Sequence, residues 1–140
     1  MRFNGKLEWD RSTRQILAER NLQSGGAVQQ YIDNKVLQLN EAYLPFQTGD
    51  LRNAGIRGTV PGRGEVVYNG PKAQFLYYGK VMVGVFSRSA WAKKGERKEV
   101  IGKDLTYHGA PQRGAFWFER MKANHKQEIL EGAKKISGSK

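Results

Sequence analysis

The two histidines, His108 and His125, are the first residues to test for chemistry, because imidazole is the commonest general base near neutral pH. A zinc site needs three or four closely spaced ligands. The sequence has no cysteine, and carboxylates do not flank the histidine pair. A histidine nuclease also needs a metal ligand and a general base in a compact hairpin and helix, which this spacing does not supply. We therefore expect no metal site, and we expect His125 to be a half-buried core residue.

No other motif supplies a catalytic set. Residues 62–64 lack the spacing and the following helix of a phosphate-binding loop. The serines lack the strand-turn-helix context of a nucleophile elbow. Glu96 and Glu99 form a close acidic pair, but Arg97 and Lys98 lie between them, which is typical of a solvated loop. The sequence predicts a protein that is not an enzyme and that holds no cofactor and no metal.

Positive charge is the strongest compositional signal. The chain has 24 Lys and Arg against 13 Asp and Glu, a net charge of +11, and the whole excess lies after residue 50. Such a surplus attracts phosphate by counterion release or steers an acidic protein surface, and charge alone does not choose between them. The side chains that we expect to face a DNA channel or an acidic partner are Arg88, Lys93, Lys94, Arg97 and Lys98.

Aromatic side chains form a clustered group, and one tryptophan stands apart from it. Clustered rings can stack on bases, but they more often close a small core or anchor a subunit interface. Because no Arg or Lys alternates with them, we favour core and interface, with Trp117 as a core anchor. Trp91 lies alone in the basic stretch, so we expect it to pack on another chain. The clustered rings are Phe75, Tyr77, Tyr78, Phe116, Trp117 and Phe118.

Length and composition fit one ordinary domain. The chain has 140 residues, of which 39% are hydrophobic, enough for a core without disulfides. No run approaches the roughly 18–20 apolar residues that cross a bilayer, and the N-terminus lacks the apolar core of a signal peptide. The absence of cysteine suits a reducing cytoplasm. We expect a single domain over residues 1–136 with a long loop or hairpin arm at 80–112, and a disordered tail at 137–140.

Two short elements are predicted before residue 25. Phe3, Leu7 and Trp9 all fall on odd positions, which predicts a short edge strand with one buried face. Ser12, followed three residues later by Gln15, forms a capping box and predicts that a short helix begins there.

A long helix and a hairpin are predicted next. Apolar residues from Val28 to Tyr43 recur every three or four positions, which predicts a helix of about five turns that ends at Pro45. Glycine, proline and polar residues predict a loop over residues 45–55. The β-branched runs 56–60 and 65–68, separated by a Gly- and Pro-rich turn, predict a hairpin.

The C-terminal half is predicted to contain a hairpin arm and a helix. Residues 81–86 and 100–107 have strand patterns and are joined by a polar, basic stretch, so we expect an arm with a mobile basic tip. Apolar residues from Phe118 to Ile136 form one stripe of a helix over 115–136, in which Gly132 costs roughly 1 kcal/mol relative to Ala. The expected fold class is α+β. It combines a small, mainly antiparallel sheet with the long N-terminal-half helix and the C-terminal helix packed on it, plus the projecting arm.

Three segments resemble a known family when they are taken together and in this order. They are YLPFQTGDLRNAG at 43–55, VVYNGPKAQFLYYGK at 66–80 and DLTYHGAPQRGAFWFERMKANH at 104–125. The combination resembles the minor capsid proteins of tailed phages of Gram-positive bacteria, within a wider group of neck or tail-completion proteins. The resemblance covers about residues 27–130.

The resemblance implies a structural virion protein that assembles as a ring around the DNA channel and brings no catalytic residues. The implied partners are copies of itself, the adjoining head-completion or connector and tail-terminator proteins, and passing genomic DNA without sequence specificity. The implied location is the virion, assembled in the bacterial cytoplasm. The segment that we expect to contact neighbouring subunits, together with Trp91, comprises Thr48, Gly49, Asp50, Leu51 and Arg52.

Two other function classes stay open at this point. A basic nucleic-acid-binding regulator is one. A recognition helix should carry several basic residues, and the predicted helix 27–42 carries only Lys35, but the C-terminal helix carries more. A small nuclease or ribonuclease toxin is the other, and it lacks a catalytic set.

Overall fold

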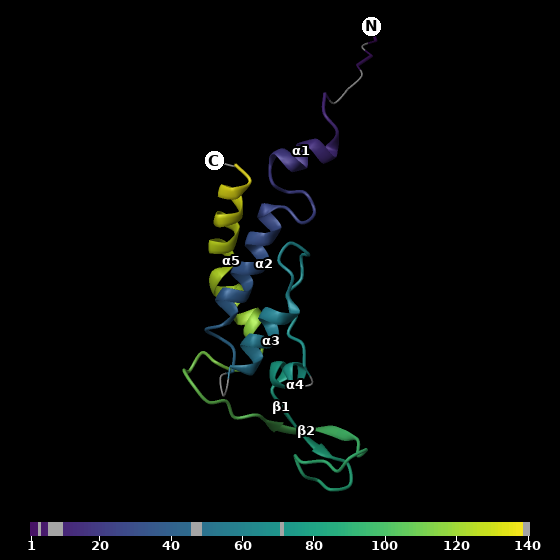
Figure 1. Cartoon of the computed structure of the whole chain (residues 1–140), viewed down its shortest axis with the longest axis vertical. Helices are drawn as coiled ribbons and strands as arrows, with labels where there is room; N and C mark the ends of the chain where they lie inside the picture. The colour runs from purple at the N-terminus through teal and green to yellow at the C-terminus, as the bar shows by residue number, and fades with distance from the viewer. Residues whose placement is uncertain (3, 6–9, 46–48, 71, 139–140) are drawn as a thin grey trace.

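The computed structural model describes residues 1–2, 4–5, 10–45, 49–70 and 72–138. The predicted edge strand through Phe3, Leu7 and Trp9 and the last two residues of the predicted tail lie outside these ranges. Within the described ranges the fold is α+β, with five helices and one pair of antiparallel strands (Figure 1). The elements in chain order are α1 (Thr13–Glu19), α2 (Ala27–Asn40), α3 (Asp50–Gly58), α4 (Ala73–Tyr78), β1 (Lys80–Gly84), β2 (Lys98–Asp104) and α5 (Trp117–Ile136).

The short helix α1 begins at the capping box that the sequence predicts. Gln15 N–H donates to Ser12 Oγ at 3.2 Å, and Ser12 N–H donates to Gln15 Oε1 at 2.9 Å. No residue of α1 is buried, so these local bonds rather than packing define where the helix begins.

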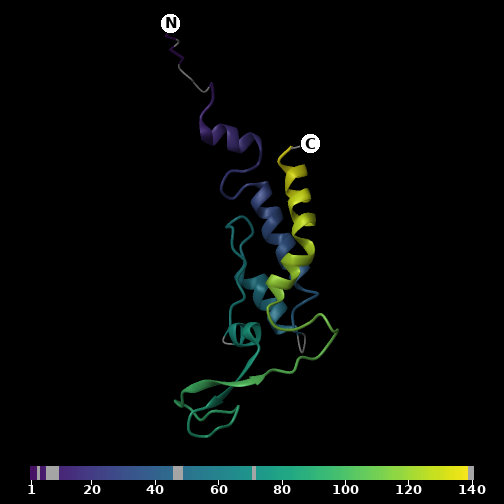
Figure 2. The same cartoon turned by 180° about the vertical axis from the view of Figure 1, so that it is seen from behind.

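The body of the molecule is a pair of long helices. Helices α2 and α5 lie side by side in both opposed views (Figures 1 and 2). Val28 and Val36 of α2 and Trp117 and Met121 of α5 supply much of the buried apolar core. Both helices confirm the sequence prediction. The regular part of α2 ends at Asn40, before the predicted end at Pro45.

The inward face of α5 differs from the prediction at its first turn. Trp117, only 3% exposed, is the buried anchor, whereas Phe118 is 36% exposed. The reason is that Trp117, Met121 and His125 step by four residues and share one face, so Phe118 falls beside the stripe. His125 is half-buried, as predicted.

The prediction of a loop over 45–55 followed by a strand at 56–60 is wrong. Residues 50–58 form α3, which begins after Gly49 in the left-handed conformation, with φ of 79°. Asp50 in the first turn and Arg57 in the last complement the helix dipole. Ala54 and Gly55 are buried, and the absence of a side chain at Gly55 lets α3 lie against the ring of Tyr68. A glycine that is typical of a loop in the sequence therefore permits close packing of a helix.

The predicted hairpin around residues 61–64 is a pinned turn without regular strands. Thr59 and Val67 approach each other, with Val67 N–H donating to Thr59 Oγ1 at 3.0 Å. The turn is held by Asp33 of α2, a buried carboxylate that accepts N–H bonds from Gly62 at 2.8 Å and Gly64 at 3.0 Å. The side chain of Asp33 thus accepts hydrogen bonds from the turn in place of those that pair two strands. The local sequence of the turn cannot indicate such a contact with another element.

The projecting arm is confirmed. Strands β1 and β2 are antiparallel, with Lys80 opposite Asp104 and Gly84 opposite Lys98, and the register is irregular between Lys80 and Met82. The arm extends from the end of the body remote from α1 (Figure 1). The strand pair is therefore the arm itself, and the two long helices pack on each other rather than on a sheet.

Candidate subunit and partner interface

The arm ends in a closed, hydrogen-bonded loop, residues 85–97, which we call the arm tip. Its backbone is fastened to the strand ends. Gly84 N–H donates to the Ser89 carbonyl at 2.9 Å, and Val85 N–H donates to the Arg97 carbonyl at 3.0 Å. The predicted strand at 81–86 therefore ends at Gly84, and the tip has a folded shape of its own.

One carboxylate organises the arm tip. Glu96 accepts N–H bonds from Phe86 at 2.9 Å, from Ser87 at 2.6 Å and from Lys93 at 2.8 Å. Hydrogen bonds to the charged form favour it. The donors, first of all Ser87 and Lys93, lower the pKa of Glu96 to about 2. The acidic residue that the sequence interpretation assigned to a solvated loop is therefore the centre of the tip.

Two large aromatic side chains stand exposed on this organised tip. Phe86 is 87% exposed and Trp91 is 90% exposed. At that exposure Trp91 joins no core formed by the described residues, as the sequence predicts. Its packing on another chain stays a prediction.

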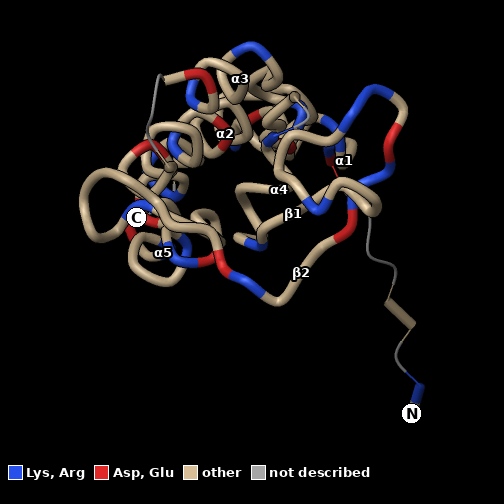
Figure 3. Tube along the Cα trace, turned by 90° about the horizontal axis from the view of Figure 1, so that it is seen from below, with Lys and Arg blue, Asp and Glu red and all other residues tan. Residues whose placement is uncertain are grey.

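The five basic residues predicted for a DNA channel or acidic partner all belong to the tip or its edge, and all are exposed. Figure 3 marks Lys and Arg in blue along the Cα trace. Two of them have partners within the chain. Arg88 pairs with Glu99, and Lys98 Nζ donates to the Ala90 carbonyl at 2.8 Å. Lys93, Lys94 and Arg97 extend from the tip toward solvent, and among the described residues no side-chain partner is found for them.

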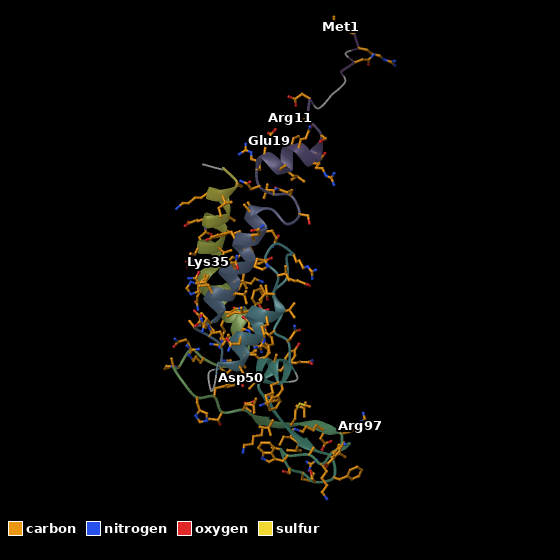
Figure 4. The ribbon with its side chains drawn as sticks, viewed as in Figure 1. Met1, Arg11, Glu19, Lys35, Asp50 and Arg97 are labelled. Atoms are coloured by element: carbon orange, nitrogen blue, oxygen red, sulfur yellow. The ribbon has the colours of Figure 1, made fainter. Side chains whose placement is uncertain are left out.

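The segment predicted to contact neighbouring subunits begins α3 and lies apart from the tip. Figure 4 places Asp50 on the helical body and Arg97 on the arm. Gly49, Asp50 and Leu51 line a groove of about 520 Å³ with residues 105–108, which follow the arm's second strand. Arg52 pairs with Glu41 at 3.1 Å, and Thr48 lies outside the described residues. The structure brings this segment to the base of the arm and not to Trp91.

A second groove, of about 670 Å³, was not anticipated from the sequence. We call it the aromatic groove, since the predicted cluster of rings forms one of its walls. Tyr77 makes an edge-to-face contact with Trp117, at 4.8 Å between ring centres, and Tyr68 makes another at 5.7 Å. Burial raises the pKa of both tyrosines. The rings that line the groove are Tyr68, Tyr77, Tyr78, Trp117 and Phe118.

The groove combines parts that lie far apart in the sequence. Helix α2 contributes Ile32, Val36 and Asn40, which face residues 64–68 and α4 across it. The cluster of rings at 75–78 and 116–118 was the available signal. It predicted core and interface, but it could not show that the rings leave an open space beside α2.

The histidines do not meet. His125 Nδ1 lies 3.1 Å from Glu128, and its Nε2 lies 3.3 Å from the Tyr43 hydroxyl. His108 lines the groove beside α3. Among the described residues, no three His, Asp or Glu side chains gather closely enough to hold a metal ion.

Across the same residues, no helix is both long and apolar enough to cross a membrane.

Comparison of the chain with family models, with curated proteins and with solved structures finds no match. The resemblance carried by the three sequence segments stays an expectation. The arm and the grooves described above are the structural features that bear on function.

Proposed function

We propose that this chain is a non-enzymatic structural subunit of a tailed-phage neck, one copy in a ring that joins head to tail around the DNA channel. The observation that carries the proposal is the arm, a strand pair that ends in a tip displaying Phe86 and Trp91 almost fully exposed. Large aromatic side chains held in solvent mark interaction sites, and buried aromatics carry much of the energy of protein interfaces.

The order of the arm tip supports an interaction role over a passive loop. Glu96 fixes the loop by three backbone hydrogen bonds, so Trp91 is presented on a defined scaffold. Binding by a pre-ordered surface avoids much of the entropy cost of ordering a flexible one. In a ring, the tip of each copy would meet another copy or an adjoining neck protein.

The exposed cations at the tip favour contact with nucleic acid as well. Lys93, Lys94 and Arg97 are exposed and extend from the same tip. In the neck they would face passing genomic DNA or an acidic partner. A regulator that binds nucleic acid is the second candidate function, and sequence-specific binding by the purified protein would favour it over the neck. Salt-sensitive binding that is equal for unrelated sequences is the result expected for a channel.

The test of the neck proposal changes the tip and leaves the fold intact. The double variant Phe86→Ser, Trp91→Ser removes both exposed rings, and Leu22→Ser, Leu130→Ser is the matched control, because these leucines are also exposed. Each gene is supplied to a phage genome from which it has been deleted. We expect the tip variant to give separate heads and tails by electron microscopy and the control to give joined, infectious particles. Normal particles from the tip variant would contradict the proposal.

A further inference from the structure

The chain carries two unpaired surfaces of matching chemistry, the arm tip and the aromatic groove. The tip displays Phe86 and Trp91 among four basic side chains and one acidic one, a net charge of +3. The groove is walled by rings, and the charged residues that line it, Asp33 and Glu65, are both acidic. One surface presents aromatic and positive groups, and the other is lined by rings and acidic groups.

The groove also holds a buried acceptor without a donor. Asn40, 1% exposed, donates from Nδ2 to the Tyr68 hydroxyl at 3.1 Å. Its Oδ1 accepts no hydrogen bond from any described residue. Buried polar atoms are normally paired, so this acceptor can gain a hydrogen bond if a small movement of the side chains around it opens it to the groove. The only polar atom of the Trp91 side chain is a donor, the indole N–H.

Within one chain, the tip and the groove do not meet. The groove lies between α2, α4 and the first turn of α5, whereas the arm extends away from this body in both opposed views (Figures 1 and 2). A tip that fills such a groove must therefore come from another molecule.

We propose that the aromatic groove receives the arm tip of a second copy of this chain, with Trp91 inserted among the rings and its indole N–H directed to Asn40. In a ring this contact is heterologous, because each copy offers its tip to one neighbour and its groove to the other. Repeated heterologous contacts close into a ring when the rotation permits. The proposal rests on the ring function above and names the surface that links neighbouring copies.

The absence of native cysteine makes the contact directly testable. One variant carries Ala90→Cys beside Trp91, and a second carries Gln74→Cys on the exposed side of α4, where Gln74 lines the groove. The two purified proteins are mixed and treated with a short bis-maleimide. The matched control replaces the second variant with Glu131→Cys, an exposed position on α5 outside the groove.

We expect the Ala90→Cys and Gln74→Cys mixture to give a mixed dimer on denaturing gels. Adding Trp91→Ala to the first variant should lower its yield by about tenfold or more, as for an interface hot spot. Adding Glu65→Lys to the second should lower the yield further at low salt, whereas Glu131→Lys should not. A yield equal to that of the Glu131→Cys control at every protein concentration, or one unaffected by Trp91→Ala, would overturn the proposal.

The result separates this proposal from the neck function. If the mixed dimer forms but phage particles do not need the arm tip, the copy-to-copy contact stands and the neck function fails. If no dimer forms while the tip variant still leaves heads and tails apart, the neck function stands and the tip binds another protein.

Discussion

The two described tryptophans of the folded chain illustrate a division between body and arm. Trp117 is 3% exposed and lies between α2 and α4 at the start of α5, whereas Trp91 is 90% exposed on the arm tip. The same side chain buries a large apolar surface against its own chain in one case and offers it to solvent in the other. The body therefore contains the buried core of the molecule, whereas the arm displays large aromatic side chains to solvent.

Truncating the two tryptophans should give the largest contrast. Trp117→Ala removes a buried ring and leaves a cavity, which typically costs about 3–5 kcal/mol. We expect the melting temperature to fall by roughly 10 °C or more, or the protein to become insoluble. Trp91→Ala is the matched control and should melt within a few degrees of the parent. A Trp117→Ala protein that melts like the Trp91→Ala protein would show that the division is wrong.

Substitution of two glycines, one in the body and one in the arm, should show the same contrast with smaller effects on stability. A Cβ on Gly132 of α5 would overlap the Tyr31 ring of α2, whereas a Cβ on Gly102 of β2 would meet open space. In Gly132→Ala, overpacking by the added methyl group should lower the free energy of unfolding by about 1–3 kcal/mol. The higher helix propensity of Ala offsets about 1 kcal/mol of this loss. Gly102→Ala should stay within about 0.5 kcal/mol. Urea unfolding of both variants measures the difference, and a stabilised Gly132→Ala protein would contradict the packing of α2 on α5.

The smallest effect on global stability is expected at Glu96. Glu96→Ala removes the acceptor for three N–H groups of the tip, which belong to Phe86, Ser87 and Lys93. We expect an almost unchanged melting temperature but faster hydrogen exchange at these three amides. Glu99→Ala is the control, since Glu99 pairs with the exposed side chain of Arg88. Unchanged exchange in the Glu96→Ala protein would show that the tip is ordered by something else.

The same carboxyl should make the tip sensitive to acid. The folded-state pKa of Glu96, about 2, lies below its ordinary value of 4.5, so protonation opposes the folded arrangement. The contribution is complete above pH 4.5 and is lost as the pH falls through about 2. Amide chemical shifts of Ser87 and Lys93 should follow that transition in NMR titrations, and an inflection near pH 4.5 would contradict it.

The sequence predicted those parts of the fold that depend on local periodicity. Helices α2 and α5, the Ser12 capping box and the arm are all confirmed, although Trp117 rather than Phe118 is the buried residue at the start of α5. Helix α3 was missed because the glycines, the proline and the polar residues of 45–55 were interpreted as a loop, although Gly49 caps the helix and Gly55 is buried in it. Gly132 was interpreted as a cost to helix formation, and only the contact with Tyr31 reveals its use.

The candidate surfaces divide in a similar way. The sequence indicated Trp91 and the basic residues as a candidate surface, because a lone ring in a charged stretch has no apolar neighbours along the chain to pack on. The aromatic groove was not found, since it depends on how α2, the pinned turn and α4 are placed around the rings. The Asp33 contacts that hold the turn join residues about thirty positions apart, and no local pattern encodes them.

The attachment of the arm to α4 has a mechanical consequence. Leu105 N–H donates to the Gly79 carbonyl at 2.8 Å, the Tyr107 hydroxyl donates to the Leu76 carbonyl at 2.6 Å, and Phe116 N–H donates to the Tyr77 carbonyl at 2.9 Å. Both strands are thus tied to one short helix, so a pull on the tip loads them in parallel and does not slide one past the other. The tension passes through α4 to Tyr77, whose ring rests on Trp117, and is transmitted there to the long helices.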